Sequence, residues 1–102
     1  MKEINELINE LAAQISYTNE YRSFKAAEEK ISSDELDKIK RYKCLKIKLI
    51  NTFSVEMENT ANELYRELSI NEDIKEYMLC EKVLSGMVAD IYDEIGKRLN
   101  IV

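Results

Sequence analysis

The side chains best suited to chemistry in this chain are two cysteines, scattered carboxylates and a run of lysines, with no histidine among them. The absence of histidine excludes Ser–His and Cys–His nucleophilic pairs in their usual form. The carboxylates Glu28 and Glu29, and likewise Asp93 and Glu94, are adjacent in sequence, so on a helix they diverge and form no convergent acid–base pair. Both glycines are isolated, and no glycine-rich loop is present to bind phosphate. We therefore expect no catalytic residue and no cofactor.

Cys44 and Cys80 are the only side chains that could form a disulfide, and the only thiols that could bind a soft metal ion. If a helical hairpin turns near Ile70, the two cysteines differ by roughly 24 Å along it, at about 1.5 Å per residue. That separation excludes a disulfide and a shared metal ion within one straight hairpin, although ligation across an assembly stays open. Cys80, beside Met87 at the edge of an apolar stripe, is interpreted as a small buried hydrophobe.

A basic segment at residues 38–48 stands out in a chain whose net charge is −5. It holds six of the chain's 15 basic residues and no acid: Lys38, Lys40, Arg41, Lys43, Lys46 and Lys48. Such a segment is a candidate contact for RNA or for the acidic surface of a second copy. The six side chains spread around much of a helix, and only Tyr42 among them could stack on a base. Both observations favour a solvated helix over a nucleic-acid site.

A heptad repeat near the C-terminus is the strongest pattern in the chain. Its members recur at steps of three and four: Ile74, Tyr77, Glu81, Leu84, Val88, Ile91 and Ile95. Residues so spaced fall on one stripe of a helix, and that stripe must meet another helix. The carboxylate of Glu81 is unfavourable there unless it is paired or solvated, so we expect a basic or hydrogen-bonding partner that sets register or partner choice. The seven residues are our candidate helix-packing interface.

Composition predicts that helices surround this repeat. The 102 residues suffice for one domain, and they include no proline, no tryptophan and only two glycines. Charged residues make up 34% of the chain and hydrophobic ones 45%, which is typical of amphipathic helices rather than disorder. No apolar run is long enough to span a bilayer or to form a signal-peptide core, and two scattered cysteines suit a reducing compartment. We expect a cytoplasmic protein that does not bind membranes.

The helices can be placed from their caps. A first helix is predicted over about 2–16, followed by a kink near residues 16–19 at which Thr18 caps a second helix. Ser32 and Glu35 have capping-box spacing, and from there one long helix is predicted to run to about Leu68. Its apolar stripe comprises Leu36, Ile39, Tyr42, Leu45, Leu49, Ile50, Phe53, Met57, Ala61, Leu64 and Leu68.

A second break is predicted at residues 69–72. Ser69 and Glu72 again have capping-box spacing, and Asn71 is an alternative cap for a last helix to about Arg98. Because the connection is short, the two long helices should be antiparallel neighbours. The sequence therefore predicts one all-α domain over 1–102: a long antiparallel helical hairpin with an N-terminal kinked helix, forming a coiled-coil-like bundle.

Two stretches resemble the YlbF/YmcA family. Residues 11–21, LAAQISYTNEY, followed by Phe24 and Ala27, are similar to its LA-x-x-I-x-x-(S/T)-x-E-Y signature. The C-terminal pattern L-x-x-N-x-x-(V/I)-x-x-Y-x-x-x-E-x-x-L is matched by Leu68, Asn71, Ile74, Tyr77, Glu81 and Leu84. The chain departs from the family at Glu72, where proline is common, and at residues 51–62, which lack a glycine common in relatives.

The resemblance implies an all-α cytoplasmic protein that self-associates. It also implies a non-catalytic subunit of a complex that works with the endoribonuclease RNase Y in mRNA processing, and so controls competence, biofilm formation and sporulation. The expected assembly is a homo-oligomer, dimer or tetramer, or a hetero-oligomer with related helical proteins. Some assemblies of that complex carry iron–sulfur clusters, but Cys44 and Cys80 align with none of the ligands. The alternatives are direct RNA binding through Lys38–Lys48 and an iron–sulfur or redox sensor subunit.

Overall fold

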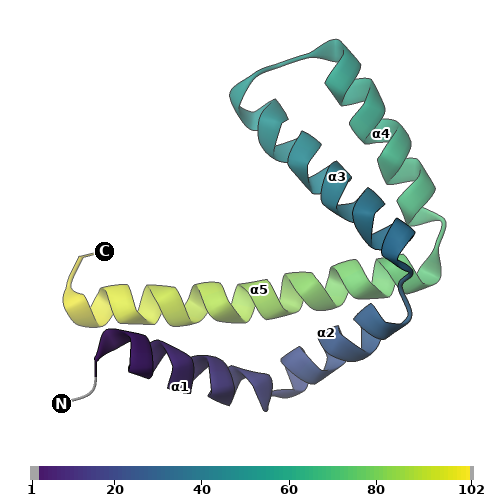
Figure 1. Ribbon diagram of the computed structural model, residues 1–102. Helices are drawn as coiled ribbons and strands as arrows, with labels where there is room; N and C mark the ends of the chain where they lie inside the picture. The colour runs from purple at the N-terminus through teal and green to yellow at the C-terminus, as the bar shows by residue number, and fades with distance from the viewer. Residues whose placement is uncertain (1–2, 102) are drawn as a thin grey trace.

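The computed structural model describes residues 3–101, which form five α-helices and no strand. In order they are α1 (Ile4–Ser16), α2 (Asn19–Glu29), α3 (Ser33–Asn51), α4 (Val55–Ser69) and α5 (Glu72–Leu99). Figure 1 shows two arms that diverge from one junction: α1 and α2 run along α5, and α3 folds back on α4. We call the first the long arm and the second the hairpin. The predicted all-α class is confirmed.

The N-terminal part of the long arm follows its predicted caps. The kink lies at Tyr17 and Thr18, between α1 and α2, as expected. The Thr18 hydroxyl oxygen accepts a hydrogen bond from the Tyr21 amide at 3.2 Å, which satisfies one free donor at the start of α2. The predicted capping box before α3 is also present, because the Ser32 hydroxyl accepts from the Glu35 amide at 3.1 Å and the Glu35 carboxylate accepts from the Ser32 amide at 3.0 Å.

The predicted continuous helix to Leu68 is wrong, because the chain turns at Thr52–Ser54. Thr52 and Ser54 have extended backbone conformations, and the Ser54 hydroxyl caps α4 by accepting from the Met57 amide at 3.3 Å. Acidic residues in the first turn of α4 suit the positive end of its dipole. The turn lets α4 pack on α3, and Ala61, Leu64 and Leu68 become buried. A serine cap without a flanking glycine or proline gave too weak a local signal to predict this turn.

The predicted pairing of the two long helices is wrong for the same reason. The antiparallel hairpin forms between α3 and α4, whereas α5 packs along α2 (Figure 1). The predicted capping box of Ser69 is also absent: Ser69 ends α4, and its hydroxyl donates to the Arg66 carbonyl at 3.2 Å. Asn71, the alternative cap, begins α5, and its side-chain oxygen accepts from the amides of Asp73 and Ile74 at 2.9 and 3.2 Å.

The hydrophobic core lies at the junction of the two arms. Its buried members come from α2, α3, α4 and α5: Ala27, Ile39, Leu68, Ile74 and Tyr77. The rings of Phe24 and Tyr77 pack with their centroids 5.3 Å apart and join α2 to α5. The molecule measures 51 × 33 × 18 Å, so both arms extend well beyond this core. Across residues 3–101, no helix is both long enough and apolar enough to cross a membrane.

Candidate protein-interaction surfaces

The heptad stripe of α5 passes from the core to open surface. Ile74 and Tyr77 are buried, with 3% and 5% of their surface exposed. Glu81, Leu84 and Ile91 are half-buried. Val88 and Ile95 keep 46% and 47% of their surface exposed. The first two residues of the stripe therefore pack within the chain, and the role of the remainder as an interface stays a prediction.

Helix α1 has an apolar face that this chain does not bury. Ile4, Leu7, Ile8 and Leu11 are spaced at three and four residues, and all four are exposed, from 39% at Leu11 to 75% at Ile4. No residue of α1 is buried. Leu11 lines an open cleft with α5, whose other walls are Ile91, Glu94, Ile95 and Arg98. The end of the long arm therefore presents two apolar helix faces beside each other.

Glu81 has the basic partner that the sequence predicted. Its carboxylate forms a salt bridge with the ammonium group of Lys43, so the basic segment of α3 is tied to α5. Both side chains keep part of their surface in water, which limits the contribution of the pair to stability. Burial raises the pKa of the nearby Tyr77 phenol, and the negative charges of Glu81 and Glu28 raise it further. This cluster links the hairpin to α5.

Two further polar contacts hold the junction. The Asn71 amide donates to the Glu35 carboxylate at 2.7 Å, and the Lys30 ammonium lies 3.5 Å from the Glu76 carboxylate. The first contact joins the cap of α5 to the cap of α3. Each cap was predicted from local spacing. The hydrogen bond between the two caps was not predicted, because it depends on how the two arms cross.

The basic segment is partly neutralised by the chain's own acids. Lys38 contacts Glu67 of α4 at 2.8 Å, and this hydrogen bond, with the negative charge of Glu67, raises the pKa of Lys38. Lys43 is bound to Glu81, as described above. The other four cations are exposed and form no ion pair within residues 3–101: Lys40, Arg41, Lys46 and Lys48. Two of the six predicted contacts thus serve internal packing, which does not favour the RNA hypothesis.

The tip of the hairpin is an apolar surface that sequence reasoning missed. Ile50 and Phe53 were assigned to the core stripe of a continuous helix, but they are 81% and 72% exposed. Ile47 and Val55 are exposed beside them. The missed turn explains the error: because the chain reverses at Thr52–Ser54, these residues lie at the end of the hairpin, away from α1, α2 and α5 (Figure 1).

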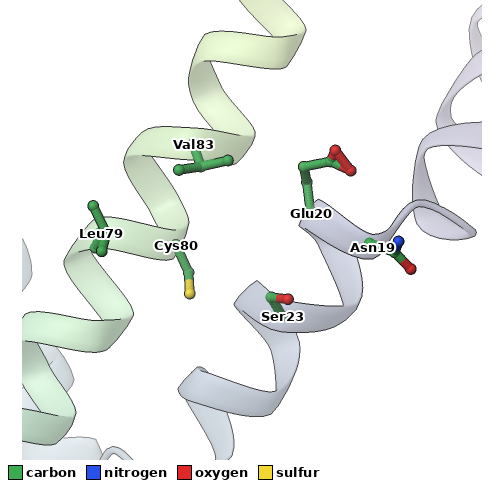
Figure 2. A pocket seen from close by; sticks show the side chains of 6 residues that line it. All are labelled: Asn19, Glu20, Ser23, Leu79, Cys80 and Val83. Carbon is green, nitrogen blue, oxygen red and sulfur yellow. The ribbon is translucent and has the colours of Figure 1, made fainter.

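The cysteines lie on different arms and are both free. Cys44 is exposed on α3, so the 24 Å argument, which assumed one straight hairpin, used the wrong geometry. Cys80 is half-buried against the core and lines an open pocket between α2 and α5. Figure 2 shows Cys80 on α5 directed toward the side of α2 that carries Ser23. Among residues 3–101, no three potential ligands of His, Cys, Asp or Glu type are grouped to hold a metal ion.

Comparison with known proteins shows which proteins this chain is similar to. A family model described as "Control of competence regulator ComK, YlbF/YmcA" matches residues 4–100. A UPF0342 protein of Caldicellulosiruptor saccharolyticus is 31% identical over 99% of this chain and 91% of its own length. A UPF0342 protein of Caldicellulosiruptor bescii is 34% identical over 89% of this chain and 83% of its own length. No solved structure matches the chain.

Proposed function

The chain belongs to the YlbF/YmcA family, and we propose that it acts as a non-catalytic regulatory adaptor in the cytoplasm. The description of the family links its members to control of a competence regulator. An adaptor works through its surfaces, and this chain carries exposed apolar side chains at the end of the long arm and at the tip of the hairpin.

The specific proposal is a subunit of an assembly that modulates RNase Y-dependent mRNA processing, and thereby competence, biofilm formation and sporulation. The carrying observation is that so many large hydrophobic side chains of a small protein lie outside its core. Contiguous exposed apolar surface of this kind marks protein interaction sites. The polar groups of the junction, by contrast, pair with one another within the chain.

The test combines transcript mapping with partner identification in the native host. Deleting the gene should lengthen RNase Y-dependent transcripts, because their processing fails, and the wild-type chain should restore the processed ends. Affinity capture of the tagged chain should recover RNase Y or its known subunits after nuclease treatment, which excludes tethering by RNA.

The matched variants are Phe53→Asp at the hairpin tip and Asn59→Asp, an exposed position of α4. We expect Phe53→Asp to weaken capture while Asn59→Asp does not. Unchanged transcript ends together with no ribonuclease subunit in the captured material would contradict the proposed function.

A further inference from the structure

Three cations of the basic segment share one exposed face of α3. At about 100° per residue, Lys40, Arg41 and Lys48 fall within an arc of about 100° around the helix. All three are exposed, and none forms an ion pair within the part of the chain that the structure describes. Cys44 and Ile47 are also exposed and widen the arc only to about 120°. We call these five residues the basic face of α3.

The other three cations of the segment point elsewhere. Lys38 pairs with Glu67 of α4, and Lys43 pairs with Glu81 of α5. Lys46 lines a groove between α3 and α4. The six cations therefore separate into two that form salt bridges within the chain, one at the groove and three that face outward together.

Exposed apolar side chains continue the basic face to the tip of the hairpin. Ile47 is 60% exposed, and Ile50, one turn further along α3, is 81% exposed. Phe53 follows at the turn and is exposed as well. Among the described helices, only α4 runs along α3 (Figure 1), so the outward side of α3 is left uncovered by this chain. Apolar side chains one helical turn apart, bordered by charges of one sign, are typical of a surface that binds an amphipathic helix.

We propose that the basic face of α3 binds an acidic amphipathic helix of a partner protein. The partner helix lays its apolar side on Ile47 and Ile50 and directs its carboxylates toward Lys40, Arg41 and Lys48. The proposal deepens the proposed function, on which it rests for the presence of a partner, by naming the chemistry of that partner.

The distribution of charge over the chain favours an acidic partner at this face. All 20 acids lie outside residues 38–48, together with only nine of the 15 bases. An acidic helix is therefore repelled by most of the surface and attracted by this part of it, which supplies both selectivity and orientation.

The surroundings of the face do not suit RNA. A single-stranded RNA site combines cations with aromatic rings that are free to stack on bases. Tyr42 is the aromatic residue of the segment, and its ring packs against the ring of Tyr65 on α4 with the centroids 5.9 Å apart. Ile47 and Ile50 offer no ring for a base, whereas they suit the apolar side of a helix.

The tip of the hairpin does not suit an anionic membrane. A bilayer that reached Phe53 and Val55 would also meet Glu56 and Glu58, which lie in the first turn of α4. Anionic lipids repel these carboxylates. A helix that lies along α3 contacts the basic face without meeting the acidic start of α4.

The first experiment measures binding of a designed probe to the purified full chain by fluorescence anisotropy. The probe is a labelled peptide of about 20 residues, with leucine at two positions of each heptad and glutamate on its other faces. We expect a dissociation constant of about 10–100 μM at about 50 mM salt, which rises as salt screens the charges. A matched peptide with lysine in place of glutamate should bind at least about 10-fold more weakly.

Substitutions locate the site on α3. Lys40→Glu combined with Lys48→Glu should weaken binding of the acidic peptide at least about 10-fold. Lys82→Glu combined with Lys97→Glu is the matched control, because it changes the net charge equally at exposed positions of α5.

A second pair of variants tests the apolar contact. Ile47→Ser should weaken binding at least about 5-fold, because it removes apolar surface that the peptide covers. Leu79→Ser on α5 is the control, since Leu79 and Ile47 are exposed to a similar extent, 62% and 60%. Circular dichroism verifies that each variant keeps its helices.

The second experiment leaves the basic face intact and uses Cys44 as its reporter. The acidic peptide receives one cysteine on its apolar side and is mixed with the Cys80→Ser chain in the presence of oxidised glutathione. We expect a mixed disulfide between the peptide and Cys44, detected by mass spectrometry, and much less of it with the lysine peptide. In the reciprocal Cys44→Ser chain, the half-buried Cys80 should remain unlinked.

Several results would overturn the inference. The acidic peptide binds no better than the lysine peptide, the α5 controls weaken its binding as much as the α3 variants, or it links to Cys80 rather than to Cys44. A single-stranded RNA that binds more tightly than the peptide, and is lost with Lys40→Glu and Lys48→Glu, would assign the face to RNA. Vesicles of phosphatidylglycerol bound through Ile47 would assign it to a lipid surface.

The result is separable from the test of the proposed function. Peptide binding at the basic face together with unchanged transcript ends would support this inference and contradict only the proposed function. Lengthened transcripts in the deletion strain together with no peptide binding would support the proposed function and overturn this inference.

Discussion

The two halves of α5 carry the same heptad repeat but differ in how much of it is buried. In the N-terminal half, Ile74 and Tyr77 are enclosed by α2, α3 and α4. In the C-terminal half, Val88 and Ile95 keep 46% and 47% of their surface exposed, and Ile95 lines an open cleft with Leu11 of α1. The difference arises from the fold, because the hairpin leaves the long arm at the junction and covers nothing beyond it (Figure 1).

The comparison separates two meanings of one sequence pattern. A heptad repeat predicts that one face of a helix packs against another helix. It does not indicate whether that second helix belongs to the same chain or to another one. In this protein the first part of the stripe is buried in the core, and Val88 and Ile95 in the second part stay about half exposed. Substitutions in the two halves should therefore change the free energy of unfolding by different amounts.

The largest effect is expected at the buried end of the stripe. Ile74→Ala should lower the free energy of unfolding by about 2–5 kcal/mol, because it removes a buried side chain and leaves a cavity in the core. Val88→Ala should cost less than about 1 kcal/mol in dilute protein, where its side chain is already half exposed. Urea denaturation followed by circular dichroism at low protein concentration measures both. Equal losses at the two positions would remove the distinction between the halves.

A smaller effect is expected at the start of α5. Asn71→Ala removes the cap of Asp73 and Ile74 and the hydrogen bond to Glu35, so it should cost about 1–2 kcal/mol. The exposed Asn59→Ala is the control and should change stability by less than about 0.5 kcal/mol. Thermal melts of both variants give the comparison. A neutral Asn71→Ala would show that neither the cap of α5 nor its hydrogen bond to Glu35 stabilises the junction.

Local signals in the sequence were enough to predict the class and most helix ends. Thr18, Ser32 and Asn71 cap helices through hydrogen bonds that span only two or three residues, so spacing alone identifies them. The turn at residues 52–54 was missed because apolar residues continue the stripe of α3 through it in the sequence, and Ser54 was its only marker. Missing that turn changed which helices pair.

The candidate surfaces were harder to predict for a different reason. The stripe of α5 and the apolar face of α1 could be read from periodicity, but their exposure depends on where the hairpin points. For Glu81 the sequence predicted only a basic or hydrogen-bonding partner from another helix or another subunit. The identity of that partner, Lys43, depends on how α3 crosses α5. The apolar surface at the hairpin tip could not be predicted from the sequence, because the turn that forms the tip was not predicted.

The salt bridge between the arms should contribute little to stability. Replacing Glu81 with Leu is expected to change the free energy of unfolding by less than about 1 kcal/mol, because the pair is partly exposed. A double-mutant cycle that combines Glu81→Leu with Lys43→Met measures the coupling free energy between Glu81 and Lys43 by urea denaturation. A change in oligomer mass or in capture of partners, without a change in stability, would show that Glu81 sets register or partner choice. If stability, mass and partner capture are all unchanged, Glu81 is an ordinary edge residue.

The smallest effect concerns the pH dependence of the junction. The hydrogen bond from the Ser32 amide lowers the pKa of Glu35 below its usual 4.5, and the Ser32 hydroxyl lowers it further. A carboxyl whose pKa is depressed on folding stabilises the protein fully above its unfolded pKa, and this contribution is lost as pH falls through the folded pKa. The melting temperature of the wild type should therefore exceed that of Glu35→Gln at neutral pH, and the difference should shrink below about pH 4. Because Glu35 is accessible to solvent, the difference should be no more than a few degrees. Glu63→Gln, on the exposed side of α4, is the control for general charge effects. A difference between the wild type and Glu35→Gln that stays constant from neutral pH to pH 3 would show that the ionised carboxylate does not hold the caps of α3 and α5 together.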